Sequence, residues 1–292
     1  MAGLFLSVFF FTSYAIAGLK KIVAVSKFEN KTSWSGQWNL DDGMADQLTD
    51  SLMQSGEFIV LERQTLGDVL DEQDLAASGR AMQSKTAQTG KVTSAQMLIK
   101  GTITEFEAQS GGSGTGVSLF GVSVGGKKEE AHVGIIIRLI DTTTGQVIDS
   151  KRVEGKAQSG GFKLGLDIAG VGFGTDNFKK MPLGKATQMA IDSAVEFIAA
   201  KLRTLPYQGR VIKVSGSDIY LSASGSTGAA VDNVFTVYSK GEELVDPDTG
   251  EILGSEETKI GEVKIFEVQE KFSKAKVMSG SNIKAGNIIK DK

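Results

Sequence analysis

Short β-rich runs and amphipathic helical repeats alternate along the first hundred residues. Ile22–Phe28 is rich in residues that favour β-structure, and this run predicts a strand. A helix should follow, with Asp41 or Asp42 as its N-cap and Gly56 as its end. Three apolar residues at intervals of four mark the buried face of that helix: Met44, Leu48 and Leu52.

The alternation continues with a strand at Phe58–Leu61, a helix at Gln64–Ala77 and a strand at Gln96–Glu107. The second helix should turn four apolar residues inward: Leu66, Val69, Leu70 and Leu75. Strands and helices that alternate at this spacing predict a layer of helices packed on a sheet.

A β-hairpin is predicted over about 112–140, in a stretch without any helical period. Two β-rich runs, Val117–Val124 and Ala131–Ile140, flank a polar segment at 125–130. Alternate apolar residues line one face of the second run: Ala131, Val133, Ile135, Ile137 and Leu139. The other face is mixed, and we expect His132 to lie there as a polar residue of a lumen or an interface, not as a metal ligand.

A second hairpin is predicted over about 154–179. Its alternate apolar residues share one face: Phe162, Leu164, Leu166 and Ile168. Beyond Ala169 and Gly170 the parity of the pattern reverses, which is what a tight hairpin tip does.

The hairpins fit two environments. Alternating apolar and polar residues suit a soluble antiparallel sheet that packs one face on a core. They also suit transmembrane strands, which need roughly 9–11 residues each and place their apolar side chains toward lipid. Two hairpins cannot close a barrel alone, so insertion into a membrane would require a cyclic oligomer. The pattern leaves both interpretations open.

The last third of the chain divides at a helix between two prolines. Gly184–Leu205 lies between Pro182 and Pro206 and carries a broad apolar stripe: Ala186, Met189, Ala190, Ala194, Phe197, Ile198 and Leu202. Residues 207–292 contain only short β-rich runs separated by Gly, Ser and Asp turns. We therefore expect an α/β domain over 18–206 and a small all-β barrel over 207–292.

The N-terminal 17 residues have the pattern of a signal peptide. An apolar run, Leu4–Phe11, leads to Ala15-Ile16-Ala17, which matches the small-x-small rule of a cleavage site. The positively charged start that is usual in signal peptides is missing, so a retained segment or a different start codon is the alternative to cleavage after Ala17. Export from the cytoplasm is expected in either case.

Composition argues against several function classes. The chain has no cysteine and one histidine, so thiol catalysis, disulfides and multi-histidine metal sites have no basis within it. A net charge of −3 lacks the basic footprint of a nucleic-acid binder. Gly121–Lys127 has the spacing of a phosphate loop, but Lys128 stands where a hydroxyl is needed and a strand pattern follows. We expect no enzyme activity, no cofactor, no metal and no nucleic-acid partner.

One segment is similar to a known family. Phe58–Leu75 reads FIVLERQTLGDVLDEQDL, which resembles the signature of the curli assembly/transport (CsgG) family of outer-membrane secretion channels. The resemblance extends over roughly Lys20–Leu205 and includes LIDTTTGQV at Leu139–Val147. The tail from Gly209 resembles the small C-terminal β domain of the flagellar accessory protein FlgT.

The resemblance implies an α+β fold, in which an α/β periplasmic body carries two extended hairpins and a small C-terminal β-barrel. It implies a homo-oligomeric ring in the outer membrane, whose hairpins form a shared transmembrane barrel with Phe162, Leu164, Leu166 and Ile168 facing lipid. The loop Glu29–Leu40 would form the pore constriction, although it is several residues shorter than in curli channels. Its candidate constriction residues are Trp34, Gln37, Trp38 and Asn39.

The resemblance also implies a function. Such a pore would passively export unfolded or fibre-forming polypeptide, with accessory proteins in the periplasm or at the cell surface. The family's lipidated N-terminal cysteine has no counterpart in this sequence. The alternative is a soluble periplasmic accessory protein of a flagellar or cell-envelope assembly, with ordinary short hairpins.

Overall fold

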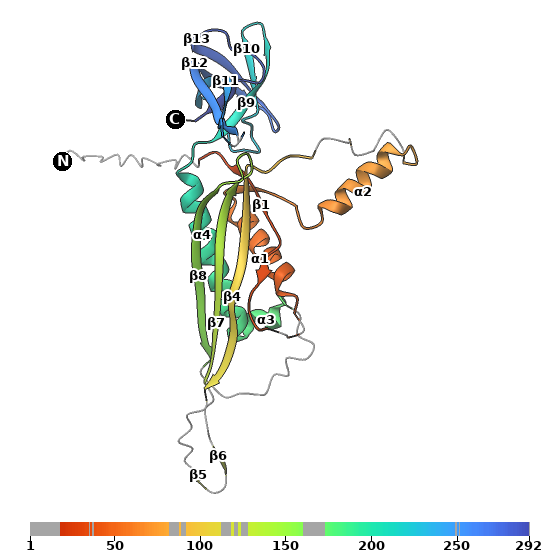
Figure 1. Ribbon diagram of the computed structural model, residues 1–292, viewed down its shortest axis with the longest axis vertical. Coiled ribbons are helices and arrows are strands. Elements are labelled where there is room, and N and C mark those ends of the chain that lie inside the picture. Colours follow the sequence, from red (N-terminus) through yellow and green to blue (C-terminus); the bar gives the residue numbers. More distant parts are fainter. Residues whose placement is uncertain are drawn as a thin grey trace, which may run out of the picture.

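The structure is a computed structural model that describes residues 18–34, 36, 38–81, 88, 92–111, 118–119, 122–123, 128–159, 173–248, 250 and 252–291. An elongated body of sheet and helices occupies the middle of the molecule, and a C-terminal β-barrel lies at one end (Figure 1). The short strands β5 (Ser118–Leu119) and β6 (Val122–Ser123) pair with each other at the opposite end. The predicted α+β composition is therefore confirmed.

The body contains a mixed sheet with the strand order β3-β1-β4-β7-β8. β1 pairs in parallel with β3 and β4, whereas β4, β7 and β8 form a long antiparallel run. A two-residue strand, β2, also pairs with β4. The strand bounds are β1 Lys21–Val25, β2 Glu29–Asn30, β3 Phe58–Leu61, β4 Met97–Gly111, β7 Lys128–Asp141 and β8 Val147–Ser159.

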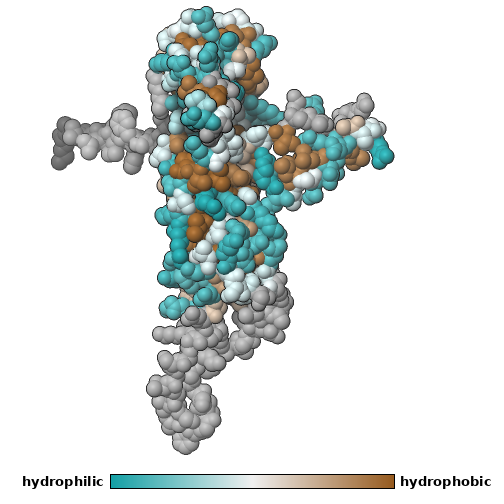
Figure 2. All heavy atoms as spheres, in the orientation of Figure 1, coloured by the Kyte–Doolittle hydropathy of each residue, from teal (hydrophilic) through white to brown (hydrophobic). Residues whose placement is uncertain are grey.

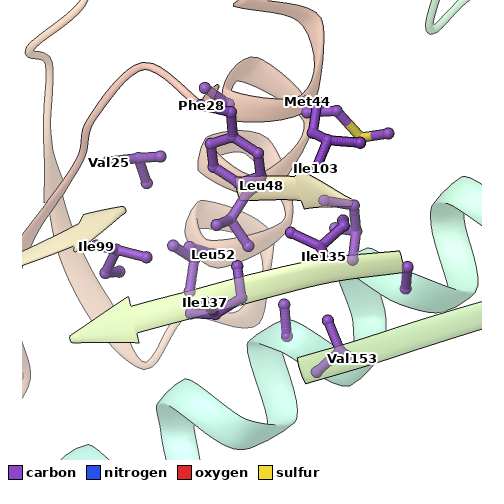
Figure 3. Packing of buried hydrophobic residues seen from close by; sticks show 14 of the residues in the cluster. Val25, Phe28, Met44, Leu48, Leu52, Ile99, Ile103, Ile135, Ile137 and Val153 are labelled. Carbon is purple, nitrogen blue, oxygen red and sulfur yellow. The ribbon is translucent and has the colours of Figure 1, made fainter. Parts of the chain in front are cut away.

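One face of this sheet is covered by α1 (Leu40–Ser55) and α4 (Pro182–Arg203), as Figures 1 and 3 show. Five alternate residues of β7 point into this layer with no exposed surface: Ala131, Val133, Ile135, Ile137 and Leu139. Their burial removes apolar surface from water and supplies about 1.5–3 kcal/mol for each large side chain. Met189 was predicted in the buried stripe of α4, but it is 50% exposed because it lies on the solvent side of that helix.

The start of α1 differs from the prediction. Asn39 is the N-cap, because its side-chain oxygen accepts a hydrogen bond from the Asp42 backbone N–H at 3.5 Å. Asp41 and Asp42 lie in the first turn instead, where the helix dipole favours negative charge. The predicted end is confirmed, since Gly56 adopts the left-handed conformation (φ 69°) of a helix C-cap.

The second helix, α2 (Leu66–Ala77), does not pack inward as predicted. It stands away from the body (Figure 1), and Val69, Leu70 and Leu75 are 40%, 46% and 43% exposed. The apolar spacing identified a helix correctly, but spacing alone does not say which surface the apolar side meets. That surface is not the sheet of the same chain.

Part of each predicted hairpin belongs to the long strands β7 and β8 of the body sheet. β4 and β7 pair in register as far as Gly111 and Lys128, and β7 pairs with β8 as far as Ser159. The run 131–140 therefore belongs to the body, not to an extended hairpin. At the other end of the second hairpin, Asp176–Lys180 forms a short helix, α3, because the Thr175 side chain caps it. The predicted lipid-facing residues Phe162, Leu164, Leu166 and Ile168 lie outside the described residues.

The C-terminal barrel is closed, with the strand order β10-β13-β12-β11-β14-β9. Closure leaves no free strand edge, and the barrel has its own core around Phe235, Val237 and Ile265. The prediction of a small β-barrel in this part of the chain is confirmed, whereas its resemblance to FlgT stays a prediction. The strand bounds are β9 Gln208–Ser215, β10 Asp218–Leu221, β11 Val234–Val245, β12 Ile252–Val268, β13 Ser273–Gly280 and β14 Ile288–Lys290.

Candidate functional site

An aromatic cluster lies where the predicted constriction loop meets β4 and α3. It consists of Trp34 and Trp38 from the loop, Phe106 of β4, Phe173, and Phe178 of α3. The indoles of Trp34 and Trp38 stack with their centroids 5.3 Å apart and an interplanar angle of 16°. Phe106 meets Trp34 edge-on at 5.0 Å, and Phe178 meets Trp38 edge-on at 5.0 Å.

Phe173, which lies within the second predicted hairpin (about 154–179), extends the cluster to that segment. Its ring centroid lies 4.6 Å from that of Phe178 and 6.2 Å from that of Trp38. Pairs at these separations contribute roughly 0.5–1.5 kcal/mol each beyond their buried area. The cluster therefore ties the loop to the base of the second hairpin.

The loop itself is held by a chain of short-range hydrogen bonds. The Asn30 side-chain oxygen accepts from the Thr32 backbone N–H at 2.9 Å and from the Thr32 hydroxyl at 2.7 Å. The Thr32 hydroxyl oxygen in turn accepts from the Trp34 backbone N–H at 3.1 Å. The Lys31 backbone N–H donates to the Ile103 carbonyl of β4 at 2.9 Å. These bonds fix the loop against the sheet up to Trp34.

The four predicted constriction residues occupy different positions. Trp38 is only 7% exposed and belongs to the main core. Asn39 is exposed, and its side chain caps α1. Trp34 is half-buried, and Gln37 lies outside the described residues. The constriction role of all four stays a prediction, but within one chain Trp38 and Asn39 already have structural roles.

A charged cluster lies on the opposite face of the same strands, and sequence reasoning missed it as a unit. His132 of β7 places its Nε2 atom 3.2 Å from a carboxylate oxygen of Glu105 on β4 and 3.3 Å from one of Glu154 on β8. Gly134 leaves the space between the two carboxylates open, since a Cβ there would lie 2.9 Å from the Glu105 oxygen. The register of three neighbouring strands, which the sequence does not specify, brings these residues together.

Arg152 of β8 completes this cluster. Its guanidinium donates to Glu105 and, at 3.0 Å, to Glu154. The hydrogen bond from His132 holds the pKa of Glu154 below its ordinary value, and Lys156 acts in the same direction. Glu105, His132 and Glu154 present ligand atoms within 4.8 Å of one another, a spacing that would suit a metal ion. Arg152 binds both carboxylates and Lys156 lies 3.5 Å from Glu154, so these two cations offset the two negative charges, and the ion pairs link three neighbouring strands.

No helix in the described part of the chain is both long and apolar enough to cross a membrane.

Comparison with known proteins adds family information to this geometry. Residues 7–211 match the family model described as curli production assembly/transport component CsgG. The CsgG protein of Salmonella typhimurium is 24% identical over 107 residues, which cover 35% of this chain and 39% of that protein. An uncharacterised protein of Aquifex aeolicus is 30% identical over 82 residues, covering 28% of this chain and 16% of its own length. This chain therefore matches well under half the length of either relative.

Among solved structures, a hypothetical protein of Chlamydia trachomatis is similar with a TM-score of 0.41 and 15% identity. The similarity covers 62% of this chain and 96% of that chain.

Proposed function

Because this chain belongs to the CsgG family, we propose that it is a subunit of a homo-oligomeric outer-membrane pore for passive export of polypeptide. The body would lie in the periplasm, and each copy would contribute its two hairpin segments to one shared barrel. The curated relatives are named as curli production components, so unfolded or fibre-forming polypeptide is the proposed cargo class.

The observation that carries this proposal is the common end of β4, β7 and β8. The pairs Gly111–Lys128 and Glu129–Ser159 are the last in the two ladders. The three strands therefore stop together at one end of the sheet, from which the proposed hairpins would extend. Hairpins that began at this common end would extend the sheet as neighbouring strands.

The residue pattern of the second segment suits lipid on one side. Between 160 and 172, apolar residues at Phe162, Leu164, Leu166 and Ile168 alternate with polar or small ones. In a membrane barrel such alternation places the apolar set toward lipid and the other set toward the lumen. One chain cannot close a barrel, and an open strand edge is not tolerated in lipid, so the proposal requires a ring of copies.

We further propose that the four residues of the constriction loop have two different roles. Trp34 and Gln37 would face the axis of the ring, and the buried Trp38 and the capping Asn39 would hold the loop in position. A ring of aromatic side chains narrows a pore and contacts an unfolded chain without demanding a particular sequence. The aromatic cluster would set the position of Trp34, because Trp38 stacks beneath it.

Cysteine accessibility tests the barrel, since the natural chain contains no cysteine. Single cysteines replace Leu164 and Leu166 in one set and Lys163 and Gly165 in another, and the protein is reconstituted into liposomes. A water-soluble maleimide should label the second set and spare the first. Val231→Cys, at a position 53% exposed on the C-terminal domain, is the labelling control. Equal labelling at all four positions would contradict the barrel and favour the soluble accessory protein.

A further inference from the structure

We propose that α2 docks on the sheet of a second copy of this chain, on the face that α1 and α4 leave uncovered. The inference rests on the proposed ring, and it specifies one contact between adjacent subunits. It arises from two apolar surfaces of the same chain that lack a partner in the described part of the structure.

The first surface is one side of α2. Leu66, Val69 and Leu70 lie at i, i+3 and i+4 and so share a helix face. Val69 is 40% and Leu70 is 46% exposed, whereas Gln73, one turn further along the same face, is buried, so the exposed apolar surface is the first half of the helix. Figure 2 shows hydrophobic side chains along this projecting helix. An isolated helix of 12 residues is marginal in water, so α2 requires a packing partner for stability.

The second surface is the outer face of the sheet, which we call the open face. Leu98 of β4 is paired with Ile140 of β7, and Ile140 is paired with Val147 of β8. Val147 is 53% exposed, and Ile136 and Ile140 are half-buried. In Figure 2 the upper half of the body displays a hydrophobic patch toward the viewer, on the side where Figure 1 places these strands in front.

The charges of the two surfaces are complementary. The open face carries Lys100 paired with Arg138, in the row next to Leu98 and Ile140. Glu29 lies near both cations and offsets part of their charge, and Lys31 binds Glu29. Among the described residues, Arg138 donates only to the Thr102 hydroxyl at 3.2 Å, and its Nε has no acceptor. α2 carries no basic residue, and its acidic residues are Asp68, Asp71, Glu72 and Asp74. An acidic helix with an apolar side therefore matches an apolar surface with a basic border.

The turn before α2 explains why the partner is a second copy and not the same chain. Only residues 62–65 connect β3 to α2. The Glu62 carboxylate accepts from the backbone N–H groups of Gln64 at 2.5 Å and Thr65 at 3.0 Å. The Gln64 amide donates to Asp46 of α1 at 2.7 Å, and Arg63 donates to the Thr93 carbonyl at 2.8 Å.

These bonds attach the start of α2 to α1, which covers the opposite face of the sheet. With these bonds in place, α2 points away from the body and not onto the open face of its own sheet (Figure 1). A helix that meets a different patch on its neighbour makes a heterologous contact, which generates a closed ring when the rotation between copies closes.

Disulfide cross-linking between copies tests the contact. Chains with Leu70→Cys are mixed with chains with Ile140→Cys, assembled and oxidised mildly. We expect a covalent dimer in the mixture and at least tenfold less from Leu70→Cys mixed with Val277→Cys, a barrel position 43% exposed. No dimer, or a bridge within a single chain that carries both cysteines, would overturn the proposal.

A charge substitution gives an independent readout. Val69→Asp should lower the fraction of assembled protein at least tenfold in native mass spectrometry, whereas Val245→Asp, at a barrel position 51% exposed, should not. Unchanged assembly of Val69→Asp would overturn the contact. Rings that conduct ions without the Leu70–Ile140 cross-link would refute this inference alone. Cross-linked rings that never conduct would refute the pore and leave the contact standing.

Discussion

Replacement of Trp38 by alanine separates a structural from a gating role for this side chain. Trp38 is 7% exposed and contacts four other aromatic rings, among them Trp34 and Phe178. Truncation of a buried tryptophan costs about 3–5 kcal/mol, because apolar burial is lost and a cavity remains. In a domain of this size that cost corresponds to a fall in Tm of roughly 6–20 °C.

Tryptophan fluorescence is well suited to this measurement. The chain has two tryptophans, and both lie in the aromatic cluster, so their emission reports on the body and not on the C-terminal barrel. In Trp38→Ala the remaining Trp34 still reports unfolding in urea. Met53→Ala, at a position 61% exposed on α1, is the matched control and should change stability by no more than about 0.5 kcal/mol.

Two results with Trp38→Ala would refute the structural role of Trp38. If Trp38→Ala unfolds at the same urea concentration as the unmodified protein, Trp38 is not a core residue. If the same variant also raises pore conductance, Trp38 lines the constriction directly, and the proposed support role is wrong.

Three further substitutions test other parts of the account. Trp34→Ala should raise single-channel conductance with a smaller loss of stability than Trp38→Ala, and an unchanged conductance would remove Trp34 from the constriction. His132→Ala should raise the pKa of Glu154 toward its ordinary 4.5, because the hydrogen bond to the carboxylate is lost; an unchanged carbon-13 NMR titration would contradict this. In the unmodified protein, the stabilising effect of this carboxylate is present above pH 4.5 and is lost as the pH falls through the lowered pKa. Gly155→Ala should destabilise the body by at least about 1–3 kcal/mol in urea unfolding, since its Cβ would lie 1.9 Å from the Ala186 carbonyl of α4, and wild-type stability would contradict that packing.

Periodicity predicted the core of the body well. The i, i+4, i+8 spacing of Met44, Leu48 and Leu52 and the alternation along 131–139 both identified residues without exposed surface. These patterns are reliable because one face of each element meets the same apolar layer. The separate C-terminal barrel was also predictable, since its short strands and turns follow a helix that ends before Pro206.

The spacing of apolar residues could not predict the surface against which α2 packs. The spacing of Leu66, Val69 and Leu70 shows that the helix has an apolar side, but not whether that side meets its own sheet or another molecule. The deciding contacts are made by polar residues of the preceding turn, such as Gln64 to Asp46. Their partners are distant in sequence and give no periodic signal.

The candidate site was predicted in part. The resemblance directed attention to Trp34 and Trp38, but the edge-on contacts of both with Phe106 depend on how the loop returns along β4. The charged cluster formed by Glu105, His132 and Glu154 was missed because it depends on register across three strands. A bulge between Ile103 and Glu105 shifts that register, and no residue pattern announces it.

Conductance of the assembled protein in a planar lipid bilayer tests the central claim most directly. Purified rings, with their mass verified beforehand, are added to one side at fixed salt and voltage. A pore of shared hairpins predicts discrete, uniform current steps, and these steps should be larger for Trp34→Ala. Verified rings that bind the bilayer and yet produce no steps would contradict the claim that this chain forms a pore.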